Sequence, residues 1–114
     1  MAKKRNKNKE NRNNDDGIIF KERVYSILRK IPKGKVITYK RLAELSGNGK
    51  AARVVGNLMR RNKNPEKIPC YKVVKSNGEI GGYSAKGGVK KKIELLKKDG
   101  IKIKNGKIEK RFLY

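Results

Sequence analysis

Residues 38–61 have the sequence TYKRLAELSGNGKAARVVGNLMRR. Thr38 is typical of a helix N-cap, because its hydroxyl can accept a hydrogen bond from a backbone N–H of the first helical turn. The apolar spacing predicts one helix over residues 39–45, with Gly47 just past its end, and a second over about residues 50–61. Two short helices joined by a glycine-bearing turn are the pattern of a helix-turn-helix.

The two faces of the second helix differ in chemistry. Arg53, Asn57 and Arg60 recur at i, i+4 and i+7, which puts them on one face. Such a face suits DNA, although a merely solvated basic surface is about as common. The other face is an apolar stripe formed by Ala51, Val54, Val55, Leu58 and Met59.

The N-terminal part of the chain divides at about residue 17. Residues 1–16 are Lys, Arg, Asn and acid with almost nothing to bury, and are predicted to form a disordered basic tail. A helix ended by Pro32 is then predicted from the helical spacing of Phe20, Val24, Ile27, Leu28 and Ile31.

The C-terminal part predicts short strands and one more helix. The expected elements are a strand over residues 67–75, a hairpin turn at Ser76-Asn77-Gly78, a helix over residues 88–98 with Val89, Ile93 and Leu96 on its apolar face, and a terminal hairpin over residues 101–108. The predicted fold class is therefore α+β. Residues 17–114 are expected to form a winged-helix-like domain with a helix-turn-helix and short β-hairpins.

The net charge of the chain limits the classes of partner that it is expected to bind. Lys and Arg number 33 against 10 Asp and Glu, a net charge of +23. The first 16 residues hold six of the basic and three of the acidic residues, so +20 belongs to the other 98. Such a chain attracts phosphate or anionic lipid. Because it has no long apolar run and does not begin like a myristoylated chain, we expect neither a signal peptide nor a membrane anchor. Nucleic acid is then the expected partner, and the cytoplasm, near the nucleoid, the expected compartment.

The chain has one cysteine, Cys70, and no histidine. This excludes an internal disulfide, a zinc site of the usual kind and any histidine general base, and we expect neither a metal nor a cofactor. Cys70 is the one strong nucleophile available. Judged from the residues alone, a lone cysteine in a Val- and Ile-rich segment is more often a small buried hydrophobe than a nucleophile.

Five short motifs follow one another along the chain. They are Gly34-Lys35-Val36-Ile37-Thr38-Tyr39, Ala51-Ala52-Arg53-Val54-Val55-Gly56, Met59-Arg60-Arg61-Asn62, Ile68-Pro69-Cys70 and Gly81-Gly82-Tyr83-Ser84. In this order and at these separations, they resemble the DNA-binding domain of the alkylguanine-DNA alkyltransferases and their alkyltransferase-like relatives, over about residues 20–100. The resemblance implies a monomer that binds duplex DNA, flips an alkylated guanine out of the stack and accepts its alkyl group without a cofactor.

The resemblance gives the second helix a role on DNA. Arg53 matches the arginine that enters the duplex in place of the flipped base, a task suited to a long, charged side chain that can stack. Its alternative is a simple phosphate contact. Ala51, Ala52 and Gly56 would let the helix approach the DNA backbone closely, or could equally serve tight helix packing. Further candidate DNA contacts are Thr38, Asn57 and Arg60.

The other residues that match the family surround Cys70, which the resemblance implies is the acceptor of the alkyl group. Tyr39 matches the tyrosine whose hydroxyl assists the departing guanine oxygen, although it could also be a packing residue. Asn62 matches the asparagine that holds the cysteine loop in shape. The implied lesion pocket is completed by Tyr83, by the Ser84 N–H and by the carbonyls of Cys70 and Val73.

The neighbour of the cysteine departs from the family pattern. Pro-Cys-His-Arg is replaced by Pro69-Cys70-Tyr71-Lys72. In the family, the histidine, a water and a glutamate take the thiol proton, and here Tyr71 and Asp99 stand in the places of the two side chains. A phenol with a pKa of about 10 is a poor base at neutral pH, so we expect reduced reliance on a proton relay. Lys72 and the positive charge of the whole chain would raise the thiolate fraction.

Three functions fit these features. The favoured one is stoichiometric, suicidal alkyl transfer to Cys70, of the methylated-DNA–protein-cysteine methyltransferase type. The alternative is a non-catalytic lesion sensor that binds alkylguanine and recruits other repair factors, although such relatives replace the cysteine and keep the histidine. The third is a plain basic winged-helix protein, which would bind alkylated and unmodified duplex equally and with steep salt dependence.

Overall fold

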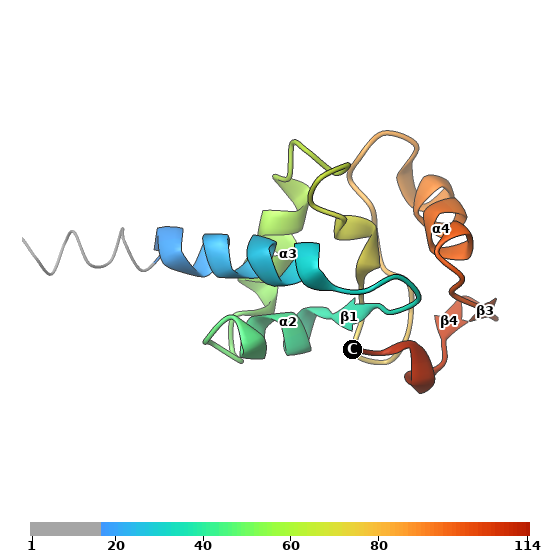
Figure 1. Ribbon diagram of the computed structural model, residues 1–114, viewed down its shortest axis with the longest axis horizontal. Coiled ribbons are helices and arrows are strands. Elements are labelled where there is room, and N and C mark those ends of the chain that lie inside the picture. The colour runs from blue at the N-terminus through green and yellow to red at the C-terminus, as the bar shows by residue number, and fades with distance from the viewer. Residues whose placement is uncertain (1–16) are drawn as a thin grey trace, which may run out of the picture.

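The computed structural model describes residues 17–114. The first helix of this part occupies residues 17–30 (blue in Figure 1), and Pro32 follows its end as predicted. Val24 and Leu28 on its inner face are fully buried, which confirms the predicted core face. The predicted basic tail, residues 1–16, lies outside the described residues.

The helix-turn-helix has the predicted order and a shorter second helix. β1, Ile37–Thr38, leads into α2, Tyr39–Leu45, and α3 spans Ala52–Arg60. The Thr38 hydroxyl accepts a hydrogen bond from a backbone N–H of the first turn of α2 at 3.0 Å, so the predicted cap is confirmed. Gly47 follows α2 with a φ of 109°, a left-handed conformation in which glycine has no steric cost.

The first helix, α2 and α3 enclose the first of two hydrophobic clusters. The buried members are Val24, Leu28, Ile31, Ile37, Leu42, Ala43, Ala51, Val55, Met59, Cys70 and Val73. The Tyr25 hydroxyl also donates to the Leu58 carbonyl at 2.9 Å, which ties the first helix to α3. Because full burial of one Val or Leu side chain contributes about 1.5–3 kcal/mol, this cluster fixes the first helix against the helix-turn-helix.

The predicted strand over residues 67–75 is wrong for most of its length. Cys70–Lys72 form a 3-10 turn, and only β2, Val73–Val74, is extended, in parallel with β1. Pro69 has no N–H for a β-ladder, and its carbonyl accepts from the Lys72 N–H at 3.0 Å to close the turn. The sulfur therefore projects from a turn instead of from a strand.

The turn at Ser76-Asn77-Gly78 is confirmed, but the hairpin around it is not a regular one. The Gly78 N–H donates to the Lys75 carbonyl at 2.9 Å. Glu79 then forms an isolated antiparallel bridge with Lys107 instead of continuing along β2. This part of the chain thus passes from β2 to the C-terminal hairpin.

The C-terminal part supplies the second cluster. α4 spans Gly88–Lys98, as predicted, and β3, Ile103–Lys104, pairs antiparallel with β4, Lys107–Ile108. A 3-10 turn, Lys110–Phe112, follows. The buried members of this cluster are Val36, Val74, Ile80, Leu96, Ile101 and Ile108.

The predicted apolar face of α4 is only partly correct. Leu96 is fully buried, but Val89 is 44% exposed. Lys92 takes the buried position between them, with no exposed surface. A charged residue on the inner face of a helix is unusual and requires internal partners.

Figure 1 shows the two halves of the domain. The first helix, α2 and α3 lie on one side, and α4 with β3 and β4 lies on the other. The C-terminus returns to the middle, where the Tyr114 N–H donates to the Val36 carbonyl beside β1 at 2.7 Å. The predicted α+β class is confirmed. None of the helices in residues 17–114 has the length and apolar character needed to span a membrane.

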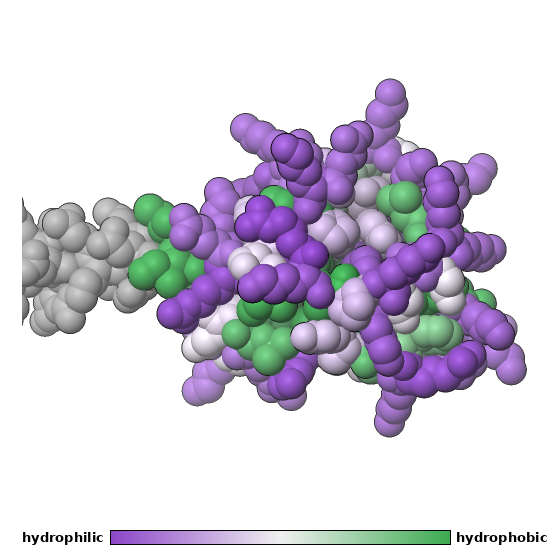
Figure 2. All heavy atoms as spheres, in the orientation of Figure 1, coloured by the Kyte–Doolittle hydropathy of each residue, from purple (hydrophilic) through white to green (hydrophobic). Residues whose placement is uncertain are grey.

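The surface is dominated by polar side chains. Figure 2 shows hydrophilic side chains projecting around the domain, with hydrophobic surface visible in smaller areas between them. This distribution agrees with the composition, in which 38% of residues are charged. A surface so rich in cations attracts polyanions over distances limited by the salt concentration.

Candidate active site

A cavity of about 620 Å³ opens between α2, α3 and the loop that precedes α4. Its lining combines eight of the predicted site residues with three others. The lining residues are Tyr39, Ala52, Arg53, Gly56, Met59, Arg60, Cys70, Lys75, Gly82, Tyr83 and Ser84. The fold thus brings together residues that are up to 45 positions apart in the sequence, from Tyr39 to Ser84.

Cys70 is the first residue of the 3-10 turn and is 6% exposed. Its loop is held by Asn62, whose side-chain amide donates to the Ile68 carbonyl at 2.8 Å. The Asn62 side-chain oxygen accepts from the Asn64 N–H at 3.0 Å. These contacts suit the role that the resemblance implies for Asn62, because they hold the segment that presents the sulfur to the cavity.

The thiol of Cys70 is mostly protonated at neutral pH. Burial raises its pKa, while the Asn62 side chain, a backbone hydrogen bond and the positive charge of Lys92 oppose that rise. The thiolate is the reactive form, and it is a minor species under these conditions. Any group that enlarges the thiolate fraction therefore enlarges the reactivity of the site.

Two tyrosines share the cavity with the sulfur. Tyr39 is the first residue of α2, and Tyr83 belongs to the loop before α4. Burial raises the pKa of both phenols, and the neighbouring Cys70 raises it further. Both hydroxyls keep their protons at neutral pH and can donate a hydrogen bond to an acceptor in the cavity. Tyr39 also packs against the first cluster, so packing and donation are compatible roles.

α3 presents the cationic wall of the cavity. Arg53 and Arg60 line it, with Ala52 and Gly56 on the same side. A Cβ added at Gly56 would meet no atom within 4 Å, so packing inside the domain does not require glycine there. This favours close approach of a partner over tight helix packing. Ala51 is different, since it is 8% exposed and belongs to the first cluster.

Three predicted residues lie beside the lining without contributing to it. The Thr38 hydroxyl caps α2, and the Asn57 side-chain oxygen accepts from the Arg60 guanidinium. The Val73 carbonyl accepts from Lys92 Nζ at 2.7 Å. Because a carbonyl oxygen has two lone pairs, that of Val73 can still accept a second hydrogen bond.

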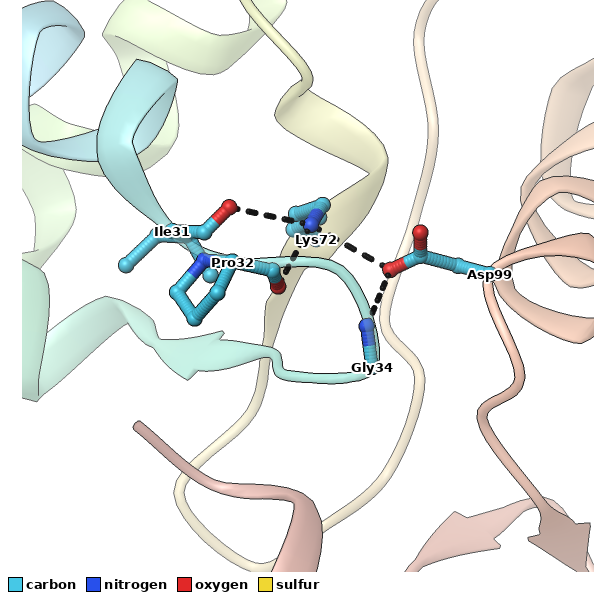
Figure 3. Close-up of polar contacts among 5 residues, drawn as sticks. All are labelled: Ile31, Pro32, Gly34, Lys72 and Asp99. Carbon is cyan, nitrogen blue, oxygen red and sulfur yellow. Dashed lines mark hydrogen bonds and ion pairs between the residues drawn. The ribbon is translucent and has the colours of Figure 1, made fainter.

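Tyr71 and Asp99, which stand in the places of the family's relay, do not line the cavity. Tyr71 packs against the second cluster, where burial and then the negative charge of Asp99 raise its pKa to about 12. Asp99 accepts from the Gly34 N–H at 3.1 Å and pairs with Lys72 at 3.2 Å (Figure 3). A phenol with that pKa cannot act as a base near neutral pH.

The expectation that Lys72 supplies positive charge to the thiol is wrong. Its ammonium donates to the carbonyls of Ile31 and Pro32 at 3.2 and 2.9 Å and is paired with Asp99 (Figure 3). The Lys72 side chain therefore ties the end of the first helix to the end of α4. Its charge is compensated within that contact.

Four further residues belong to the site or its support. Met59, Lys75 and Gly82 line the cavity, and Lys92 lies behind its wall, where it bonds to the Gly82 carbonyl. Lys92 stands four residues before the buried Leu96, on the apolar stripe of α4. A lysine at such a position could have identified Lys92 as a candidate from the sequence. Gly82 belongs to the motif Gly81-Gly82-Tyr83-Ser84, whereas Lys75 carries no comparable signal, because only the folded chain brings it to α3.

The described residues offer no metal centre. Within residues 17–114, no three His, Cys, Asp or Glu side chains gather closely enough to hold an ion. The cavity offers a thiol, phenols, backbone groups and cations. This set can bind an anionic or carbonyl-bearing ligand and present a sulfur nucleophile to it.

The family of the chain follows from comparison with known proteins. Residues 19–101 match the family described as 6-O-methylguanine DNA methyltransferase, DNA binding domain. This chain belongs to the 6-O-methylguanine DNA methyltransferase family. The match covers the helix-turn-helix, the cavity and α4.

Curated relatives of this methyltransferase-family domain are longer proteins. The bifunctional methyltransferase/endonuclease of Picrophilus torridus is 50% identical over 86 residues, which are 75% of this chain and 28% of that protein. The methylated-DNA–protein-cysteine methyltransferase of Homo sapiens is 45% identical over 80 residues, 70% of this chain and 38% of that protein. The chain thus spans less than two fifths of either relative.

Solved structures share the fold of this methyltransferase-family domain. S. pombe Atl1, in complex with damaged DNA containing O6-carboxymethylguanine, has a TM-score of 0.75 at 27% identity, over 83% of this chain and 94% of Atl1. Mycobacterium tuberculosis OGT in complex with DNA has a TM-score of 0.66 at 33% identity, over 71% of this chain and 48% of that one. The α+β domain is therefore a shared unit of longer and shorter proteins.

Proposed function

We propose that this protein binds duplex DNA, takes an alkylated guanine into the cavity and transfers the alkyl group from the guanine O6 to the sulfur of Cys70, once per molecule. One observation carries the proposal. The single cysteine of the chain lines the same cavity as Tyr39 and as Arg53 of the helix-turn-helix. Nucleophile, hydrogen-bond donor and DNA-binding surface are therefore contiguous.

The reaction is a displacement at the alkyl carbon. The Cys70 thiol loses its proton to solvent, and the thiolate attacks the alkyl carbon, so that an S–C bond forms as the O6–C bond breaks. The electron pair of the broken bond stays on guanine, which takes up one proton to become the normal base. Tyr39 donates a hydrogen bond to O6 as negative charge develops there, which lowers the barrier. The products are S-alkylcysteine and guanine, and the protein is spent.

DNA binding rests on charge and on the shape of α3. The +20 carried by residues 17–114 favours any duplex, with a strong dependence on salt. Arg53 is the side chain suited to occupy the space left by the flipped base, because its guanidinium stays charged and can stack. Open space at Gly56 supports close contact of α3 with the DNA. The DNA complexes of M. tuberculosis OGT and S. pombe Atl1 support the same partner.

The flipped base would be recognised mainly by backbone groups. The free lone pair of the Val73 carbonyl and that of the Cys70 carbonyl suit the guanine amino group, and the Ser84 N–H suits an acceptor on the base edge. Tyr83 closes the wall of the cavity. Since these groups are fixed by β2 and the loop before α4, positioning supplies much of the rate in a site without a histidine base.

Mass spectrometry of the intact protein tests the proposal. Incubation with an excess of duplex containing O6-methylguanine should add one methyl group, about 14 Da from the replacement of H by CH3, and peptide mapping should place it on Cys70. C70A is the matched control and should gain nothing while it still binds the duplex. Absence of any mass gain in the parent protein under excess substrate would overturn the proposed transfer.

A lesion sensor is the second candidate, favoured by one specific observation. Atl1 is matched over 94% of its length, and its structure holds damaged DNA. A sensor would bind alkylated duplex more tightly than unmodified duplex, with no change in its mass. If C70A protected cells from alkylating agents as well as the parent protein does, the sensor would replace the transferase as the function.

A further inference from the structure

Lys92 is a fully buried ammonium held by three backbone carbonyls. Its side chain lies on the inner face of α4 with no exposed surface. Nζ donates to the carbonyls of Val73 and Ile80 at 2.7 Å each and to that of Gly82 at 3.1 Å. These three acceptors use all three hydrogens of a protonated lysine. The contacts therefore suit the charged form, because a neutral amine would point a lone pair at a carbonyl.

The charge of Lys92 has no carboxylate partner within residues 17–114. The four ion pairs of the described chain involve other residues, and the other buried lysine, Lys72, is paired with Asp99. A buried charge without a counterion is costly, since carbonyl dipoles replace only part of its hydration. A buried charge of this kind is expected to have a functional role in addition to packing.

The ammonium lies directly behind the cavity wall. Gly82 lines the cavity, and Val73 follows the turn that begins with Cys70. A Cβ built on Gly81 would lie 3.8 Å from Lys92 Nζ and 3.8 Å from a ring carbon of Tyr39. A negative charge on the Cys70 sulfur would therefore form in the field of a desolvated cation, where attraction is much stronger than in water.

We propose that Lys92 is the positioning residue that makes Cys70 reactive, by holding a positive charge behind the sulfur at neutral pH and so stabilising its thiolate. The proposal rests on the proposed function only in taking that thiolate as the nucleophile. Lys92 need not accept the thiol proton, which goes to solvent. It also fixes the carbonyls of β2 and of the loop at 80–82, so that charge and geometry come from one side chain.

The other ionisable groups around the sulfur do not replace this charge. The phenols of Tyr25, Tyr39 and Tyr83 are neutral at pH 7, since burial raises the pKa of each. Burial lowers the pKa of Lys92 to about 8, against an opposing effect of Cys70, so Lys92 is still charged at pH 7. The remaining cations lie along the cavity lining, where solvent screens them, and they are Arg53, Arg60 and Lys75.

The reaction of Cys70 with iodoacetamide as a function of pH tests this role without DNA. K92Q keeps side-chain N–H donors and removes the charge, whereas K92R keeps the charge. We expect K92Q to slow the reaction at pH 7 ~10-fold, as the thiolate fraction falls, and the difference from the parent protein to narrow above pH 8, where Lys92 itself loses its charge. K92R should stay within ~3-fold of the parent protein, because its charge is retained.

K90Q is the matched control. Lys90 is an exposed residue of the same helix, so the variant loses the same unit of charge on the solvent side. Its profile should coincide with that of the parent protein. If K92Q and K90Q gave the same profile, the proposal would be overturned.

A second measurement needs no substitution of Lys92 and tests the proposed role of its charge even if K92Q is unstable. The rate of the reaction of Cys70 with iodoacetamide is followed in the parent protein from about pH 6 to about pH 10. The rate should rise about tenfold per pH unit up to about pH 8 and then level off, because Lys92 loses its charge there and no longer stabilises the thiolate. An unbroken rise of about tenfold per unit through pH 8 would contradict the proposal. Neither experiment uses DNA, so failure of alkyl transfer from O6-methylguanine would be seen separately.

Discussion

The Lys72 ammonium and the Asp99 carboxylate form a nearly buried ion pair with an N–O distance of 3.2 Å, and their side chains are 6% and 10% exposed. The pair joins the turn that carries the cysteine to the end of α4. Asp99 also accepts from the Gly34 N–H, so the loop after the first helix is held by the same carboxylate. Asp99, which stands in the place of the glutamate of the family's relay, thus has a structural role here.

Removal of Lys72 should be strongly destabilising. In K72M, the Asp99 carboxylate stays buried without its partner and two carbonyls lose their donor, so we expect a loss of about 3–5 kcal/mol in the free energy of unfolding. Urea denaturation measures it. The exposed pair of Arg111 and Glu109 is the control, and E109Q should cost less than about 1 kcal/mol. Equal losses of unfolding free energy in the two variants would show that the Lys72–Asp99 pair stabilises the fold no more than the exposed pair does.

Loss of the Tyr39 hydroxyl should slow alkyl transfer without weakening DNA binding. Y39F keeps the ring that packs on the first cluster and removes the donor for the departing O6, so single-turnover transfer from O6-methylguanine should slow by about 10²-fold. Y25F is the control. The Tyr25 hydroxyl bonds to the Leu58 carbonyl, and its loss should reduce stability by about 1 kcal/mol while the transfer rate stays within about threefold. If Y39F and the parent protein transferred the alkyl group at similar rates, the role of Tyr39 would be limited to packing.

Arg53 distinguishes insertion into the duplex from a phosphate contact. If Arg53 stacks in the place of the flipped base, R53K should lose most of the preference for alkylated over unmodified duplex, since a lysine lacks the planar group. Fluorescence anisotropy at two salt concentrations measures both affinities. R41K changes an exposed arginine of α2 in the same way and should have no such effect. Full function of R53K would assign Arg53 to phosphate contact.

Tyr71 should make the domain lose stability at alkaline pH. The folded pKa of about 12 lies above the unfolded value of about 10, so the folded state holds a proton that the unfolded state releases in this interval. The corresponding stabilisation is complete below pH 10 and is lost as pH rises through 12. Y71F has no such group, and its urea midpoint should fall less than that of the parent protein between pH 9.5 and 11.5. Parallel curves would mean that Tyr71 is not shifted in the folded state.

Local sequence was sufficient for the helix-turn-helix and α4. The cap at Thr38, the turn at Gly47 and the apolar spacing of the helices act over a few residues, so the elements form where these signals stand. The predicted strand over residues 67–75 failed because β-propensity competes there with Pro69 and with a long-range pairing to β1. Such pairing has no signature within the segment itself.

The sequence by itself determined the family, the cysteine and the absence of a histidine, since these depend on residue identity and order. Only the tertiary structure decided which lysine serves the thiol. Lys72 is next but one to Cys70 in the chain, yet its charge is neutralised by Asp99, 27 positions away. Lys92 is distant in sequence, yet packing of α4 buries its ammonium behind the cavity. Electrostatic effects depend on distance and burial in space, which the order of residues does not contain.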